Sequence, residues 1–131
     1  MNSKKSISTL ALAVFATVTS LSAQDASFHN APASSATTAN SHTSDSDIKA
    51  GGAVYQQKCA ACHGPEAKGQ ANIPALANGP TQSAKPGEVF WYITKGDLAN
   101  GMPSWSALPE EQRWQVVSYL KYLGGPNAKP L

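Results

Sequence analysis

The stretch Cys59-Ala60-Ala61-Cys62-His63 decides what this chain can fold around. It holds both cysteines of the sequence, and a histidine follows the second one directly. On a helix, residues at positions i, i+3 and i+4 share a face, so the two thiols and the imidazole are expected to point the same way. Three reactive or metal-binding side chains on one helical face indicate a site for a cofactor.

The spacing C-x-x-C-H is the attachment sequence of c-type haem. We therefore expect one haem c, with Cys59 and Cys62 forming thioethers and His63 binding the iron. A thioredoxin-like C-x-x-C needs a βαβ context, which the sequence does not show. A zinc site needs further ligands, and residues 47–131 hold no other Cys or His. A structural disulfide stays open as an alternative, although it would strain a helix.

The iron then needs a second axial ligand or an open position. Met102 is the one methionine after residue 23, and it stands between Gly101 and Pro103, which indicates a loop. We expect Met102 to be the second axial ligand, because a His/Met pair is the ligand set of cytochromes c. The alternative is a methionine that fills a gap in the core.

Length and composition bound the remaining possibilities. The chain has 131 residues, enough for one domain, with 41% hydrophobic and 14% charged residues. Residues 1–23 combine Lys4 and Lys5 with a short apolar run and a small residue at Ala23, which is the pattern of a signal peptide. We expect cleavage there and a periplasmic location. The remaining chain is formally neutral, which argues against a nucleic-acid partner.

Residues 24–46 are rich in Ser, Thr, Ala and Asn, and we expect a disordered linker. His29 and His42 lie in it and are expected to be solvated rather than to bind a metal. If the signal segment instead stayed in the membrane as an anchor, the linker would act as a tether with a reach of about 25 Å.

Residues 47–131 are expected to form one all-α domain of three to four short helices wrapped around the haem. The first helix is predicted to begin near Ser46 and to run through Cys62. Further helices are predicted over 86–95, opened by a proline, and from Pro109 to the Gly124-Gly125 pair. The stretch 64–85 lacks periodicity. A domain with so few helices needs a bulky cofactor to complete its core.

These residues resemble the class I monohaem cytochrome c family over nearly all of 47–131. The resemblance rests on the segments 59–64 and 101–105, in the form of short bacterial cytochromes with a Gly-Met-Pro-x-Trp loop. Gly51 and Tyr55 look like the family's Gly/aromatic pair on the first helix, and Tyr119 and Leu120 look like the positions of the last helix that cross them. The resemblance implies a cytochrome c-like fold.

The resemblance also implies roles for three further residues. Pro74 would accept a hydrogen bond from His63 through its carbonyl, and Trp91 and Trp105 would pack near the haem edge. For both tryptophans, an ordinary place in the core is an equally good interpretation. Leu108-Pro109 departs from the family's usual polar cap before the last helix, which affects only the boundary of that helix.

The function implied is that of an electron carrier and not an enzyme. Its partners would be redox proteins: a periplasmic dehydrogenase, a quinol-oxidising complex or a terminal oxidase. The chain would be a monomer or a fixed subunit of such a complex. A peroxidase or gas sensor with an open iron position is the alternative, with Asn100, Ser104 and Gln70 as its weak polar candidates. Three lysines could steer docking or be solvated: Lys58, Lys68 and Lys95.

Overall fold

The computed structural model describes residue 28, residues 30–126 and residue 128, so the predicted signal peptide lies outside the described residues. The described residues are helical and form no strand, only two isolated bridges. The elements, in chain order, are η1 (Ala33–Thr37), α2 (Asp45–Lys58), α3 (Ala60–His63), α4 (Pro80–Ser83), α5 (Pro86–Lys95), η2 (Leu98–Asn100) and α6 (Glu110–Leu123). The expected all-α class is confirmed. None of these helices has the length and apolar character that a membrane crossing requires.

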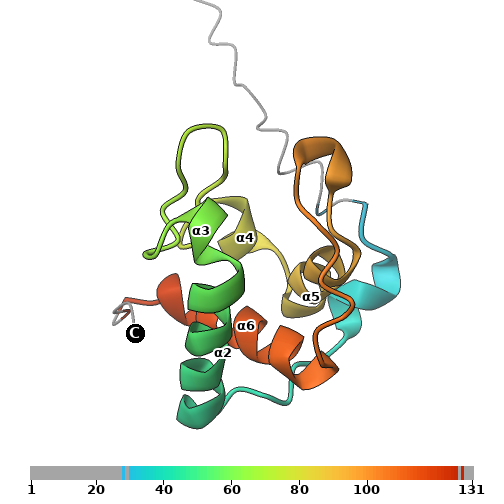
Figure 1. The fold of residues 1–131 in the computed structure, drawn as a ribbon. Coiled ribbons are helices and arrows are strands. Elements are labelled where there is room, and N and C mark those ends of the chain that lie inside the picture. Colours follow the sequence, from blue (N-terminus) through green and yellow to red (C-terminus); the bar gives the residue numbers. More distant parts are fainter. Residues whose placement is uncertain (1–27, 29, 127, 129–131) are drawn as a thin grey trace, which may run out of the picture.

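Helices α2 and α6 cross each other closely and form the centre of the fold (Figure 1). Gly51 makes this approach possible, because a side chain there would collide with the backbone carbonyl of Gln115 on α6. One turn further along α2, the ring of Tyr55 packs against that of Tyr119, with 5.4 Å between centroids. The crossing of the Gly51 and Tyr55 pair by the last helix, which the family resemblance implied, is therefore present.

Helix α5 packs on the other side of α6 and completes the core. Phe90 of α5 stacks on Trp114 of α6 at 3.9 Å between ring centroids. The guanidinium of Arg113 lies over the Phe90 ring, 4.9 Å from its centroid. Its Nη1 donates to the hydroxyl of Thr94 at 2.5 Å. These contacts fix the end of α5 that leads into the methionine loop.

The short helix α4 lies within the stretch 64–85 that was expected to be irregular, and α6 anchors it. The ammonium of Lys121 donates to the carbonyls of Thr81, Gln82 and Ala84 at 2.5 to 3.0 Å. Burial lowers the pKa of Lys121 from its ordinary value. A cation on the last carbonyls of a helix stabilises that helix end, which explains how a four-residue helix persists here.

The expectation of a disordered linker over 24–46 is wrong for its described part. Asn40 donates from Nδ2 to the carbonyl of Trp114 at 3.2 Å and to the hydroxyl of Ser118 at 2.8 Å. The hydroxyl of Ser118 in turn donates to the carbonyl of His42. The segment is thus held by polar contacts to α6, which a hydrophobic pattern cannot reveal.

A second part of this segment packs on α5. Helix η1 lies along α5, and Gly87 leaves room there for the carbonyl of Ser35. A methyl group on Gly87 would overlap that carbonyl. The folded unit therefore begins well before residue 47.

Helix α2 begins two residues earlier than the sequence predicted. Its N-cap is Ser44, not Ser46, because Ser44 and Asp47 form a capping box. Asp47 accepts from the backbone N–H of Ser44 at 3.1 Å and from its hydroxyl at 2.6 Å. These bonds, together with one from Gln115, lower the pKa of the Asp47 carboxyl.

The crossing of α2 and α6 supplies a matched pair of tyrosine substitutions. The hydroxyl of Tyr55 donates to the carbonyl of Gly64 at 2.7 Å, whereas the buried hydroxyl of Tyr119 has no hydrogen-bond partner among the described residues. Tyr55→Phe is therefore expected to lower the free energy of unfolding by about 1 kcal/mol, and Tyr119→Phe to leave it unchanged or raise it. Denaturant unfolding of the holoprotein measures both, and equal losses would contradict the assignment.

Candidate functional site

A cavity of about 720 Å³ opens between α3, α5, α6 and the loops that follow α3 and α5. This volume lies in the range of about 300 to 1,000 Å³ that is typical of ligand pockets. Most of the side chains that line it are apolar, among them Tyr55, Ile73, Leu76, Val89, Ile93, Val116 and Leu120. The cavity is therefore a water-poor site for a large, mainly apolar group.

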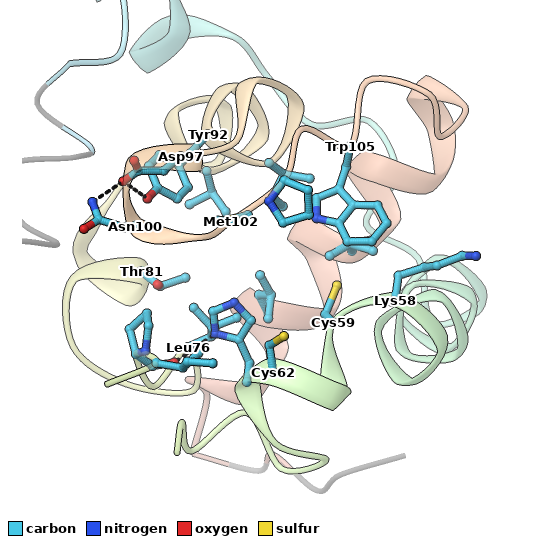
Figure 2. A pocket seen from close by; sticks show the side chains of 18 of the residues that line it. Lys58, Cys59, Cys62, Leu76, Thr81, Tyr92, Asp97, Asn100, Met102 and Trp105 are labelled. Atoms are coloured by element: carbon cyan, nitrogen blue, oxygen red, sulfur yellow. Dashed lines mark hydrogen bonds between the residues drawn. The ribbon is translucent and has the colours of Figure 1, made fainter. Parts of the chain in front are cut away.

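Cys59, Cys62 and His63 line one wall of this cavity. The amides of Cys62 and His63 both donate to the carbonyl of Cys59, at 3.1 and 2.9 Å, so the three residues occupy one helical turn. The prediction of one unbroken helix through Cys62 is wrong, because the helix is interrupted at Cys59, between α2 and α3. Figure 2 shows the sulfur atoms of Cys59 and Cys62 on the same side of the cavity.

Both cysteines are free thiols, so the structure does not contain the disulfide considered as an alternative. Burial raises the pKa of the Cys59 thiol to about 11, and the neighbouring Cys62 adds to the shift. A thiol with a raised pKa is less often in the thiolate form than the low-pKa cysteines that serve in thiol–disulfide exchange.

The imidazole of His63 is oriented by the backbone. Its Nδ1 lies 3.0 Å from the carbonyl oxygen of Pro74, the contact that the resemblance implied. Because a carbonyl can only accept, Nδ1 carries the proton and Nε2 keeps a lone pair for a metal. Pro74 also lines the cavity.

Met102 lies on the opposite wall, in the loop between α5 and α6 (Figure 2). Two backbone hydrogen bonds join it to Asp97: the Asp97 N–H donates to the Met102 carbonyl at 2.8 Å, and the Met102 N–H to the Asp97 carbonyl at 2.9 Å. The residue is half-buried at the cavity and does not sit inside a helix, as its flanking glycine and proline indicated.

The two tryptophans assigned to the haem edge lie in different places. Trp105 lines the cavity, and its backbone N–H donates to the carbonyl of Ile93 at 3.1 Å. Trp91 does not line it. Val89, Tyr92 and Ile93 of α5 turn toward the cavity, and the helical repeat places Trp91 on the other side of that helix.

Several residues of the cavity wall escaped the sequence analysis, among them Phe28, Tyr92 and Asp97. Phe28 lines the cavity, with its ring 5.2 Å from that of Tyr92, and its signal was a lone aromatic residue in a polar stretch. Tyr92 and Asp97 also line it. The sequence feature that could have identified them is the acidic side chain of Asp97, which lies in the same loop as the candidate ligand Met102.

The three lysines differ in their surroundings. Lys58 lies at the cavity. Lys68 forms an exposed ion pair with Glu66, and Lys95 lies over the ring of Trp91 at 5.3 Å. Of the three, Lys58 is placed where it can meet a partner at the cavity.

His42 was expected to be solvated, but it is half-buried. His29 lies outside the described residues. The Nδ1 of His42 is 3.6 Å from Asp47, and Glu111 stands close by. The side-chain amide of Gln115 donates to Asp47 at 3.1 Å and to Glu111 at 3.2 Å. These contacts explain why His42, Asp47 and Glu111 lie together without the need for a metal ion.

The residues of the cavity fit a haem c. Two thiols and a correctly protonated imidazole stand on one wall, a thioether stands on the other, and apolar side chains enclose the space between. This donor set differs from that of a structural zinc site, which would take four ligands converging on one point.

The comparisons with known proteins agree with this geometry. A family model described as cytochrome C oxidase, cbb3-type, subunit III matches residues 46–120, more than half of the chain. No curated protein and no solved structure matches the chain. The match includes the C-x-x-C-H segment, the candidate ligand Met102 and most of α6. The chain therefore belongs to this family of c-type cytochrome domains, whose members hold a covalently attached haem c and transfer electrons.

Proposed function

We propose that this chain is an exported one-electron carrier of the short class I type, with its haem iron bound between His63 and Met102. The observation that carries the proposal is that His63 and Met102 line one apolar cavity. His63 belongs to α3 together with Cys62, and Met102 lies across the cavity from Cys59 and Cys62. When bound, the haem supplies an iron that gains or loses one electron.

His63 and Met102 would stay in place in both redox states of the iron, because the backbone fixes each of them. Pro74 fixes the His63 ring through Nδ1, and the paired bonds to Asp97 fix the backbone of Met102. A thioether ligand and apolar walls both favour the less charged ferrous state, which places the reduction potential on the positive side for haem proteins. Thioethers at Cys59 and Cys62 would prevent loss of the haem after export.

The polar residues that could support peroxidase chemistry are bonded to protein groups. Asn100 donates to the Asp97 carboxylate at 2.8 Å, and Ser104 donates to the carbonyl of Thr94 at 2.7 Å. Gln70 donates to the carbonyls of Ala61 and Cys62, also at 2.8 Å. None of the three is an acid or base of suitable pKa, which favours electron transfer over catalysis.

The partners follow from the family and from the surface near the cavity. The matched family is described as an oxidase subunit, which supports membership of, or electron delivery to, a terminal oxidase complex. A periplasmic dehydrogenase or a quinol-oxidising complex would be the electron donor. Because the chain without residues 1–23 is formally neutral, docking would depend only weakly on salt.

Export rests on the pattern of residues 1–23, which leads us to propose a periplasmic location. Because Asn40 is bonded to α6, we propose that a retained anchor would have a shorter tether than the whole of residues 24–46. N-terminal sequencing of the purified protein is expected to begin at Gln24. A chain that retains Met1 would contradict cleavage.

Replacing the methionine tests the ligand set. Met102→Ala is expected to leave haem attached but to lower the midpoint potential by on the order of 0.1 V or more, since axial ligands set potentials over a range of about 0.8 V. Potentiometric titration measures this shift, and Leu98→Ala is the control because that side chain is 79% exposed on the same loop. An unchanged midpoint in Met102→Ala would rule out thioether ligation.

Replacing the cysteines tests covalent attachment. Cys59→Ala and Cys62→Ala are each expected to reduce the yield of haem-bearing protein and its stability, because each removes one thioether and weakens a core that the haem completes. Haem staining after denaturing electrophoresis measures attachment. Ala61→Ser is the matched control, since Ala61 is exposed between the two cysteines. Full, stable haem incorporation in either cysteine variant would contradict a two-thioether attachment.

A further inference from the structure

We propose that Asp97 is a positioning residue for Met102, and that its carboxylate, held by Tyr92 and Asn100, keeps the thioether on the iron. This inference rests on the proposed function, because it takes Met102 to be the axial ligand. It adds a part of the site that acts through the ligand and does not itself bind the iron.

The loop that carries Met102 is closed at Asp97. The two residues exchange both backbone hydrogen bonds, at 2.8 and 2.9 Å, so the position of one fixes that of the other. Between them the chain makes the short helix η2 and then turns at Gly101, which adopts a left-handed conformation at φ 85°. The Met102 backbone therefore moves with Asp97.

Among the described residues, Tyr92 and Asn100 both hold the carboxylate of Asp97. The hydroxyl of Tyr92 and the side-chain amide of Asn100 both donate to its Oδ2, each at 2.8 Å (Figure 2). Tyr92 belongs to α5 and Asn100 to η2, so the carboxylate ties the loop to the rigid helix and to its own turn. Hydrogen bonds to a charged acceptor are among the stronger ones in proteins.

Tyr92 and the far end of the methionine loop are themselves held in place by further contacts. The ring of Tyr92 packs against Phe28 of the N-terminal segment. The far end of the loop returns to α5, where the hydroxyl of Ser104 donates to the carbonyl of Thr94 at 2.7 Å and the backbone N–H of Trp105 donates to that of Ile93 at 3.1 Å. Asp97 thus lies at one of the two points where the methionine loop is fastened to α5.

The need for such a fastening follows from the loop's exposure. Several of its residues are exposed, Leu98 by 79%, so packing alone holds the loop weakly. A neutral thioether is bound without help from charge, and its hold on the metal therefore depends on how well its backbone is placed in advance. Removing the acceptor for Tyr92 and Asn100 should therefore let the methionine leave the iron more often.

The test compares holoprotein variants of one side chain. Asp97→Ala removes the acceptor, whereas Asp97→Asn keeps one oxygen that can accept from both Tyr92 and Asn100. Asp97→Ala is expected to weaken the sulfur-to-iron absorption band near the red end of the spectrum. It should also raise the rate of carbon monoxide binding to the reduced protein by about tenfold or more, as the open fraction grows. Asp97→Asn and the control Leu98→Ala are expected to keep the wild-type band and rate.

Asn100→Ala covers the case in which Asp97→Ala does not fold. It removes one of the two donors at an exposed position, and a smaller rise in the carbon monoxide rate is expected. An unchanged band and rate in both Asp97→Ala and Asn100→Ala would overturn the inference while leaving Met102 as the ligand. Loss of the band in Asp97→Asn as well would also overturn it, by showing that charge and not hydrogen bonding matters. Absence of the band in the wild-type protein would instead refute the proposed ligand set, and this inference with it.

Discussion

Two thiols and an imidazole lie within one helical turn on a wall of a large apolar cavity, and the rest of the structure depends on that placement. The turn follows α2 directly, and α2 is held against α6 by the contact at Gly51. Tyr55, which packs in this crossing, also donates to the carbonyl of Gly64, the residue after the histidine. Tyr55 therefore links the crossing of α2 and α6 to the wall that carries Cys59, Cys62 and His63.

The opposite wall is built differently. The methionine loop has no long helix of its own and is fastened to α5 at its two ends. Helix α5 in turn is fixed by stacking on α6 and by η1 on its outer side. One wall is thus the short helix α3, which follows α2 after Cys59, and the other is a loop. On the proposed function, thioether bonds would secure the first wall, whereas hydrogen bonds hold the second.

Much of this could be predicted from local sequence signals. Pro86 and Gly96 bound α5, and the acidic pair at 110–111 with Gly124 bounds α6, because caps and breakers act through the backbone nearby. The contact between His63 and Pro74 followed from family resemblance. The class of cofactor followed from five consecutive residues whose chemistry admits few other uses.

Two features could not be predicted from the sequence: polar contacts between residues far apart in the chain, and the direction in which a given residue of a helix points. The docking of 30–44 uses Asn40 and backbone carbonyls, which leave no periodic pattern. The misplacement of Trp91 arose because an aromatic residue near a ligand loop says nothing about which side of its helix it occupies. The hydrogen bonds that Tyr92 and Asn100 donate to Asp97 join residues three to five positions apart, and they form only in the folded loop.

The central claim is that one haem is joined to Cys59 and Cys62. The most direct measurement is the intact mass of the purified protein in denaturant, recorded before and after treatment with a thiol-alkylating reagent. The account predicts the mass of the polypeptide plus one haem, with no added alkyl groups. A mass equal to the bare polypeptide, rising by two alkyl groups after treatment, would contradict it.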